Sequence, residues 1–207
     1  MNWRFDEEKF INAVLFFAVN SHVQSFGITK LNKQLYYSDF EHFKQYGRPI
    51  IGDRYTRMKN GPVPSTAYNI INELLNGAEG VSVHKRLAKK IEVKKGKFRG
   101  RTIHRITPLA APDMSVFSKS EARIMKAVAD VCTTNRLSAS FLSRLSHVDG
   151  SPWSRTENNQ EIDYRLALDE SERSLSKDYV DFWTKENGDF EDIVKSLPPY
   201  GTARGAA

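Results

Sequence analysis

Cysteine and clustered histidine are scarce in this chain, and their scarcity argues against two kinds of site. The 207 residues include one cysteine, Cys132, which excludes an internal disulfide and a zinc site built from cysteines. Histidines lie far apart, without the spacing of metal ligands, at His22, His42, His84, His104 and His147. We therefore expect no metal centre.

Two further signatures are missing. The sequence contains no glycine-rich phosphate loop and no dinucleotide fingerprint, so nothing predicts a nucleotide cofactor. Its longest apolar stretch, residues 13–19, is far too short to span a membrane and lacks the layout of a signal peptide. We expect no cofactor, no membrane partner and a cytoplasmic location.

What the chain has in quantity is charge, and the charge is unevenly spread. The formal net charge is +6. Residues 81–107 hold ten Lys/Arg and a single acid, whereas residues 161–207 hold eleven acids and six bases. Hydrophobic content of 40% is ordinary for a globular protein, and the length fits one domain or one domain with an appendage. The charge pattern predicts one basic element and an acidic C-terminal part.

Residues 29–46 have the period of a helix, with Thr29 as a possible cap and Gly47 and Pro49 at its end. Apolar side chains share one arc: Leu31, Leu35, Tyr36, Phe40, Phe43 and Tyr46. The opposite arc is polar: Lys30, Lys33, Gln34, Glu41 and Lys44. This pattern predicts a helix with one buried face.

Asp39 and His42 interrupt the apolar arc three residues apart, so they are neighbours on the helix surface. Burying either without a partner costs a few kcal/mol. We interpret them as a structural pair that ties down the following loop. A general acid–base pair is the alternative, although no nucleophile or metal-binding set accompanies it.

The next segment loses the helical period. Residues 50–58 indicate a turn and a short strand, and residues 60–64 combine Asn-Gly with two prolines that enforce extended backbone. Ser65 is then placed to cap a helix over residues 66–76.

Residues 81–107 predict a basic β-hairpin, because residues 90–94 and 102–106 alternate around a turn-rich centre. Its candidate partner-binding residues are Lys95, Lys97, Phe98, Arg99 and Arg101. The charges have three interpretations: a solvated edge that resists aggregation, a surface for DNA or RNA phosphates, or a dock for an acidic protein. Nothing in the pattern specifies a base sequence.

A capping box at residues 118–121 begins another helix, and Ser138 is placed to cap a shorter one that ends near His147. The two helices give only a weak helix-turn-helix signal, with Arg144 as the sole base reader. Ser146, His147 and Asp149 have the residue types of a hydrolase triad but are adjacent in sequence. We favour a structural role, with Trp153 packed across His147.

The C-terminal part predicts a polar loop followed by acidic helices, an appendage over residues 156–197, and a disordered tail over residues 198–207. Phe182 and Trp183 lie in an aromatic cluster of this appendage. They are candidate anchors for a partner protein.

Two blocks of residues resemble the Panacea domain, the SocA-like antitoxin domain of bacteria and their phages. The first comprises Lys30, Leu31, Lys33, Leu35, Tyr36, Tyr37 and Asp39, then residues 46–50, then Gly61, Pro62, Val63 and Pro64. The second comprises residues 142–147, which end in His147, and the pair Pro152-Trp153. The resemblance implies a domain over residues 5–155.

The resemblance implies an antitoxin that is not an enzyme and that neutralises a cognate toxin by direct binding. With the periodicities, it predicts a mainly α, compact helical domain with a small antiparallel sheet or β-hairpin. The alternative is a winged-helix-like DNA-binding regulator that uses the basic hairpin. Nothing in the sequence indicates the oligomeric state.

Overall fold

The computed structural model describes residues 3–22, 24–77, 82–98, 100–134 and 138–168. Its helices are α1 (Glu7–Val19), α2 (Ile28–Tyr46), α3 (Ser65–Leu75), α4 (Ser82–Ala88), α5 (Lys119–Thr134) and α6 (Ala139–Ser146), with short 3-10 turns η1 (Met114–Val116) and η2 (Tyr164–Ala167). Its strands are β1 (Tyr55–Met58), β2 (Gly61–Pro64), β3 (Ile91–Phe98) and β4 (Arg101–Pro108). The fold is mainly α with two small antiparallel sheets, which confirms the predicted class.

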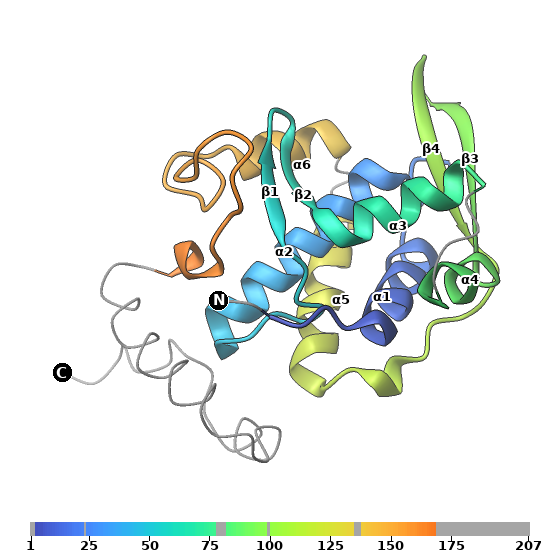
Figure 1. Ribbon diagram of the computed structural model, residues 1–207, viewed down its shortest axis with the longest axis horizontal. Helices are drawn as coiled ribbons and strands as arrows, with labels where there is room; N and C mark the ends of the chain where they lie inside the picture. Colours follow the sequence, from blue (N-terminus) through green and yellow to red (C-terminus); the bar gives the residue numbers. More distant parts are fainter. Residues whose placement is uncertain (1–2, 23, 78–81, 99, 135–137, 169–207) are drawn as a thin grey trace.

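Helix α2 lies at the centre of the molecule (Figure 1). It contacts α1, α3, α5, α6, η2 and one strand of each hairpin. Because neighbours surround it, several residues assigned to its solvent side are buried, among them Lys30, Lys33 and Gln34. The prediction of one buried face was therefore wrong, whereas the helix itself was predicted within a residue at its N-terminus.

The ends of the helices depend on different residues from those expected. Gly27, not Thr29, is the N-cap of α2, and it makes no side-chain cap. Gly47 ends α2 at φ 72°, a conformation that glycine adopts without strain. Asp53 caps α3 by accepting hydrogen bonds from the backbone N–H groups of Thr66 and Ala67. Ser65, the expected cap, instead bonds its hydroxyl to Thr56.

Strands β1 and β2 form a tight hairpin in which Tyr55 pairs with Pro64 and Met58 with Gly61. The prolines are tolerated because both lie on β2, whose other edge pairs with no further strand among the described residues. Residues 157–162 run along β1 and bond to its backbone, as the Arg57 N–H to Gln160 O bond shows. The hairpin is thus covered on one edge by a segment distant in sequence.

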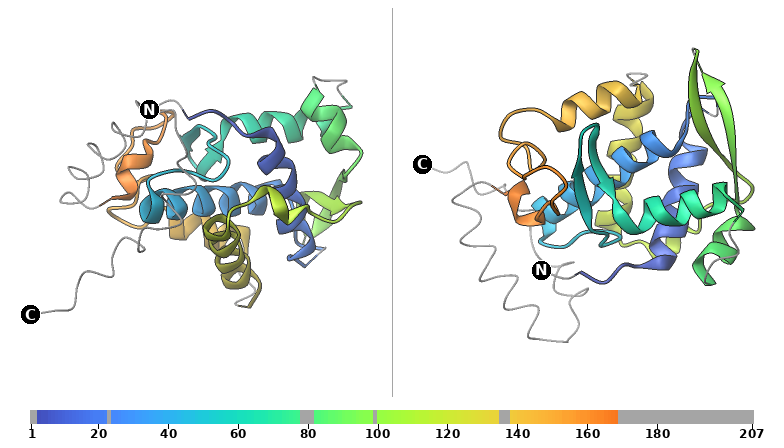
Figure 2. Two further views of the ribbon diagram at one scale, coloured as in Figure 1. Left: turned by 90° about the horizontal axis from the view of Figure 1, so that it is seen from below. Right: turned by 45° about the horizontal axis from the view of Figure 1, so that its top comes forward.

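Strands β3 and β4 form the basic hairpin, which projects beyond the helices in both Figure 1 and Figure 2. Its base is anchored, because Ile91 and Ile106 are buried and the Ile106 N–H bonds to Phe26 O. The hairpin is shorter than the predicted range of 81–107. Residues 82–88 form α4, a helix of only seven residues that burial of Val83 and Leu87 holds against the core.

Two hydrophobic clusters stabilise the molecule. The larger joins α1, α2, α3 and α5, and the predicted capping box at its edge is confirmed by reciprocal bonds between Ser118 and Glu121. The smaller joins α2 and β1 to Ile162, Tyr164 and Leu168. The packed body therefore includes residues up to Leu168, and the domain boundary at residue 155 stays a prediction. The tail and most of the appendage lie outside the described residues.

Candidate functional site

Asp39 is the centre of a buried polar network on α2. Its Oδ1 accepts hydrogen bonds from the backbone N–H groups of Ile50 and Ile51, both at 2.8 Å. Its Oδ2 accepts bonds from the hydroxyls of Tyr55 and Tyr164, both at 3.0 Å. One carboxyl group thus joins α2, the loop after it, β1 and η2.

Burial raises the pKa of Asp39 to about 7, and the four donors oppose this rise because each favours the ionised form. The same carboxylate and burial raise the pKa values of Tyr55 and Tyr164 well above their usual range, so both phenols remain donors. Both oxygens of the Asp39 carboxyl group are therefore bonded to donors of the protein itself.

His42 also holds the loop after α2, and it does not bond to Asp39. Its Nδ1 donates to Arg48 O at 2.7 Å, and its Nε2 lies 3.0 Å from Ser120 Oγ. Burial lowers the pKa of His42 to about 4, so the imidazole is neutral at pH 7. Together with Asp39, it has the structural role that the sequence indicated, and the acid–base alternative gains no support.

Lys33 lies beneath the β1–β2 turn and close to Gly61. Its Nζ donates to Pro62 O at 2.9 Å, and the side chain is 2% exposed. A Cβ atom on Gly61 would meet Lys33 Nζ at 2.4 Å and Ser146 Oγ at 2.8 Å, so only glycine fits. Burial lowers the pKa of Lys33 to about 7. Sequence reasoning assigned Lys33 to solvent and missed this contact.

His147 and Trp153 stack with ring centroids 3.8 Å apart, as the structural interpretation of the second motif block predicted. The guanidinium of Arg57 lies 4.2 Å from the Trp153 ring, and Trp153 Nε1 donates to Met58 O. Ser146 donates to Ser143 O rather than to His147. The three residue types of a triad are therefore not assembled into one.

The remaining motif residues are also structural in their placement. Leu31, Leu35 and Tyr36 are buried in the hydrophobic clusters, and Val63 pairs with Thr56 in the hairpin. Tyr37 donates its hydroxyl to Leu142 O at 2.9 Å and so joins α2 to α6. Both motif blocks meet along α2.

The basic hairpin carries its charges on two faces. Lys95 pairs with His104 and Lys97 with Thr102, so these four side chains share one face. Phe98 pairs with Arg101, which places both on the opposite face. Lys95, Lys97 and Arg101 are exposed and Phe98 is half-buried. Arg99 lies outside the described residues, as do Phe182 and Trp183.

Two features limit a winged-helix interpretation. The helix before the hairpin, α4, has its Arg86 paired with Glu7 and Glu8, which leaves Lys85 as its exposed base. Helix α6, the second candidate reader, exposes Phe141 and Leu145 and offers Arg144 as its one exposed base. Neither helix has the surface of a DNA-reading helix.

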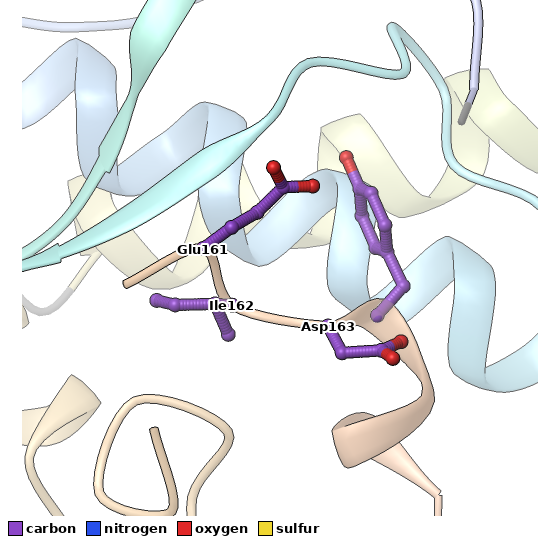
Figure 3. Close-up of a pocket in the computed structure, with 4 residues that line it drawn as sticks. Glu161, Ile162 and Asp163 are labelled. Carbon is purple, nitrogen blue, oxygen red and sulfur yellow. The ribbon is translucent and has the colours of Figure 1, made fainter. Parts of the chain in front are cut away.

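One small pocket of about 220 Å³ lies beside η2, and Figure 3 shows Glu161, Ile162 and Asp163 along it. Asp163 is engaged by Arg165, and the lining includes no serine, threonine, cysteine, lysine or histidine. Across the described ranges, no group of three or more His, Cys, Asp or Glu side chains is arranged to hold a metal ion. No helix there is long and apolar enough to cross a membrane.

A helical body whose buried polar groups bind its own backbone, with a charged hairpin beside it, has the features of an interaction domain. Comparison with known protein families matches residues 31–154 to the antitoxin SocA-like, Panacea domain. The match covers more than half of the chain, and the chain belongs to this family. No curated protein and no solved structure gives a significant match.

Proposed function

We propose that this chain is an antitoxin that neutralises a cognate toxin by direct protein–protein contact. Membership of the SocA-like Panacea family is the observation that carries the proposal. The network around Asp39, His42 and Lys33 supports a non-catalytic role, because these polar side chains are committed to the fold. The surface is then the part available to a partner.

We place the contact on the two regions that carry fewer of the family's motif residues. The first is the hairpin β3–β4, whose exposed Lys95, Lys97 and Arg101 suit an acidic protein surface. The second is the C-terminal segment with Phe182 and Trp183, an aromatic pair of the type that anchors interfaces.

Co-expression rescue tests the proposal. The open reading frame beside this gene is expressed alone and then together with this chain, and growth and co-purification are followed. Toxicity relieved by co-expression, with the two proteins in one complex that survives moderate salt, is the expected result. A harmless neighbour, or rescue without a complex, contradicts neutralisation by contact.

A DNA- or RNA-binding role is the second candidate, favoured by the exposed lysines of the projecting hairpin. It predicts an affinity that falls steeply with salt concentration, because each neutralised phosphate releases a counterion. A titration of the pure protein with duplex DNA at several salt concentrations separates the candidates. An affinity that is weak, or that hairpin charge reversal leaves unchanged, contradicts this role.

A further inference from the structure

Helix α6 exposes an apolar stripe on the side that faces away from the core. Phe141 and Leu145 are 41% and 44% exposed and share one side of α6, and Val148, which is 56% exposed, follows the C-cap of the helix at His147. The inward side already holds Leu142 and Ser146. The stripe is therefore additional to the surface that α6 needs for folding.

One basic side chain borders this stripe. The guanidinium of Arg144 lies 5.7 Å from the Phe141 ring. Asp149 is the exposed acid nearby in sequence. A matching occupant presents apolar side chains flanked by acidic ones.

The chain itself contains such a segment after the last described residue. Tyr179, Phe182 and Trp183 have the i, i+3, i+4 spacing of one helical side. Acidic residues surround them: Asp178, Asp181, Glu186, Asp189, Glu191 and Asp192.

The point at which the chain leaves the described body favours this occupant. Leu168 is buried in the same cluster as Tyr36, and the adjacent Tyr37 bonds to Leu142 O of α6. Ten residues, 169–178, separate Leu168 from Tyr179, and they span up to about 35 Å when extended. Leu168 and α6 both pack against α2, and the linker is longer than the roughly 10–12 Å width of that helix, so it can reach α6.

The small size of the stripe favours a tethered occupant over a second copy of the chain. Three partly exposed side chains offer roughly 200–300 Å² per chain, whereas stable interfaces bury about 1,200 Å² or more in total. A segment in the same chain has an effective concentration on the order of millimolar, so a small contact suffices.

We propose that residues 178–194 dock in the same chain on the stripe formed by Phe141, Leu145 and Val148. The docked segment covers the stripe and withholds Phe182 and Trp183 from other partners until one competes for them. The contact forms without any toxin, so its test is independent of the antitoxin proposal.

Fluorine NMR of the full chain labelled with 5-fluorotryptophan tests the contact. The three tryptophans are Trp3, Trp153 and Trp183, and Trp183→Phe assigns the third resonance. In the unaltered chain, the Trp183 resonance is expected away from the position of a solvent-exposed indole. Leu145→Lys is expected to move it to that position, while the Trp3 resonance stays in place as evidence of an intact fold.

Tyr68→Lys is the matched control, because Tyr68 is a 39% exposed aromatic residue on α3, away from the stripe. It should leave the Trp183 resonance unchanged, and Phe141→Ser should repeat the effect of Leu145→Lys. A Trp183 resonance that is solvent-like in the unaltered chain, or insensitive to both stripe variants, overturns the proposal. A shift that disappears on dilution identifies a second copy as the occupant and overturns it equally.

Discussion

Asp39 joins four parts of the chain through two carboxylate oxygens, and every contact it makes is with a donor. We predict that Asp39→Asn destabilises the protein by about 2–4 kcal/mol, because the new amide group has no acceptor among the donors that Asp39 binds. Urea unfolding followed by circular dichroism measures the loss. Asp130→Asn is the control, since Asp130 is exposed and bonds only to Lys126 in an i,i+4 pair. Equal midpoints for the two variants contradict the prediction.

Lys33 makes the stability of the folded state depend on pH at neutral and alkaline values. Its pKa falls from 10.5 to about 7 on folding, so between these values the unfolded chain holds a proton that the folded chain has released. For this group, stability therefore rises with pH across that window, by at most about 1.4 kcal/mol per pH unit. Below pH 7 both states are protonated and the full cost of the buried charge remains.

We predict that Lys33→Met stabilises the protein at pH 7 by about 1–3 kcal/mol, since relief of the buried charge outweighs one lost hydrogen bond to Pro62. The gain should shrink as the pH approaches 10. Urea midpoints at several pH values measure both effects. Lys44→Met on the exposed side of α2 should show neither, and the same pH slope in the Lys33 variant and the unaltered chain disproves the idea.

The sequence predicts that Asp39 and His42 need buried partners, because both interrupt an apolar arc. It does not identify those partners, since Tyr164 lies 125 positions from Asp39 and Ser120 lies 78 from His42. Lys33 was missed for a different reason. A helical projection assumes one buried face, and α2 is covered by neighbours on most sides.

At the scale of elements, the β1–β2 hairpin is held by side chains from outside it. Lys33 fixes its turn through Pro62 O, and Trp153 fixes its β1 end through Met58 O while stacking between His147 and Arg57. The hairpin has only four residues in each strand, so it depends on these contacts.

We predict that Trp153→Ala loosens this hairpin and costs about 2–4 kcal/mol of stability, because it removes both the stacking and the bond to Met58 O. Trp153→Phe keeps a ring and should cost about 1–2 kcal/mol. Hydrogen exchange of the β1 and β2 amides should rise in the same order. If both variants exchange like the unaltered protein, the hairpin is held by its own pairing.

Elements with a strong period were predictable, whereas helix α4 and the cap of α3 were not. The alternation of β3 and β4 and the capping box of α5 identify those elements from sequence alone. Helix α4 was read as part of the hairpin because seven residues give too little period and its Lys85 and Arg86 resemble the basic run that follows. The cap of α3 was missed because Asp53 precedes that helix by a whole hairpin.

At the scale of the molecule, the basic and acidic parts of the chain lie in separate regions of sequence, and only the basic one is among the described residues. The described body includes Ile162, Tyr164 and Leu168, which pack in the second cluster against α2. No local pattern reveals that long-range contact. Truncations that test the C-terminal segment therefore belong after Leu168.

The hairpin gives the last prediction. If it contacts an acidic toxin surface, Lys95→Glu with Lys97→Glu should slow association about tenfold at low ionic strength, because charge steering acts mainly on the rate of encounter. Stopped-flow or surface-binding kinetics with the purified toxin measure this rate. Both lysines are exposed, so the unfolding midpoint should stay unchanged.

Lys85→Glu with Lys89→Glu is the matched control, because it makes the same change in net charge at exposed positions outside the hairpin. An equal loss in both double variants would assign the effect to the overall charge of the molecule. A loss confined to the hairpin pair, and absent from Lys94→Glu with Arg101→Glu on the opposite face, would identify the face that meets the toxin. Such a face-specific loss is the result we expect if the toxin lies against one side of the hairpin, since opposite faces of a two-stranded ribbon cannot both meet one flat surface.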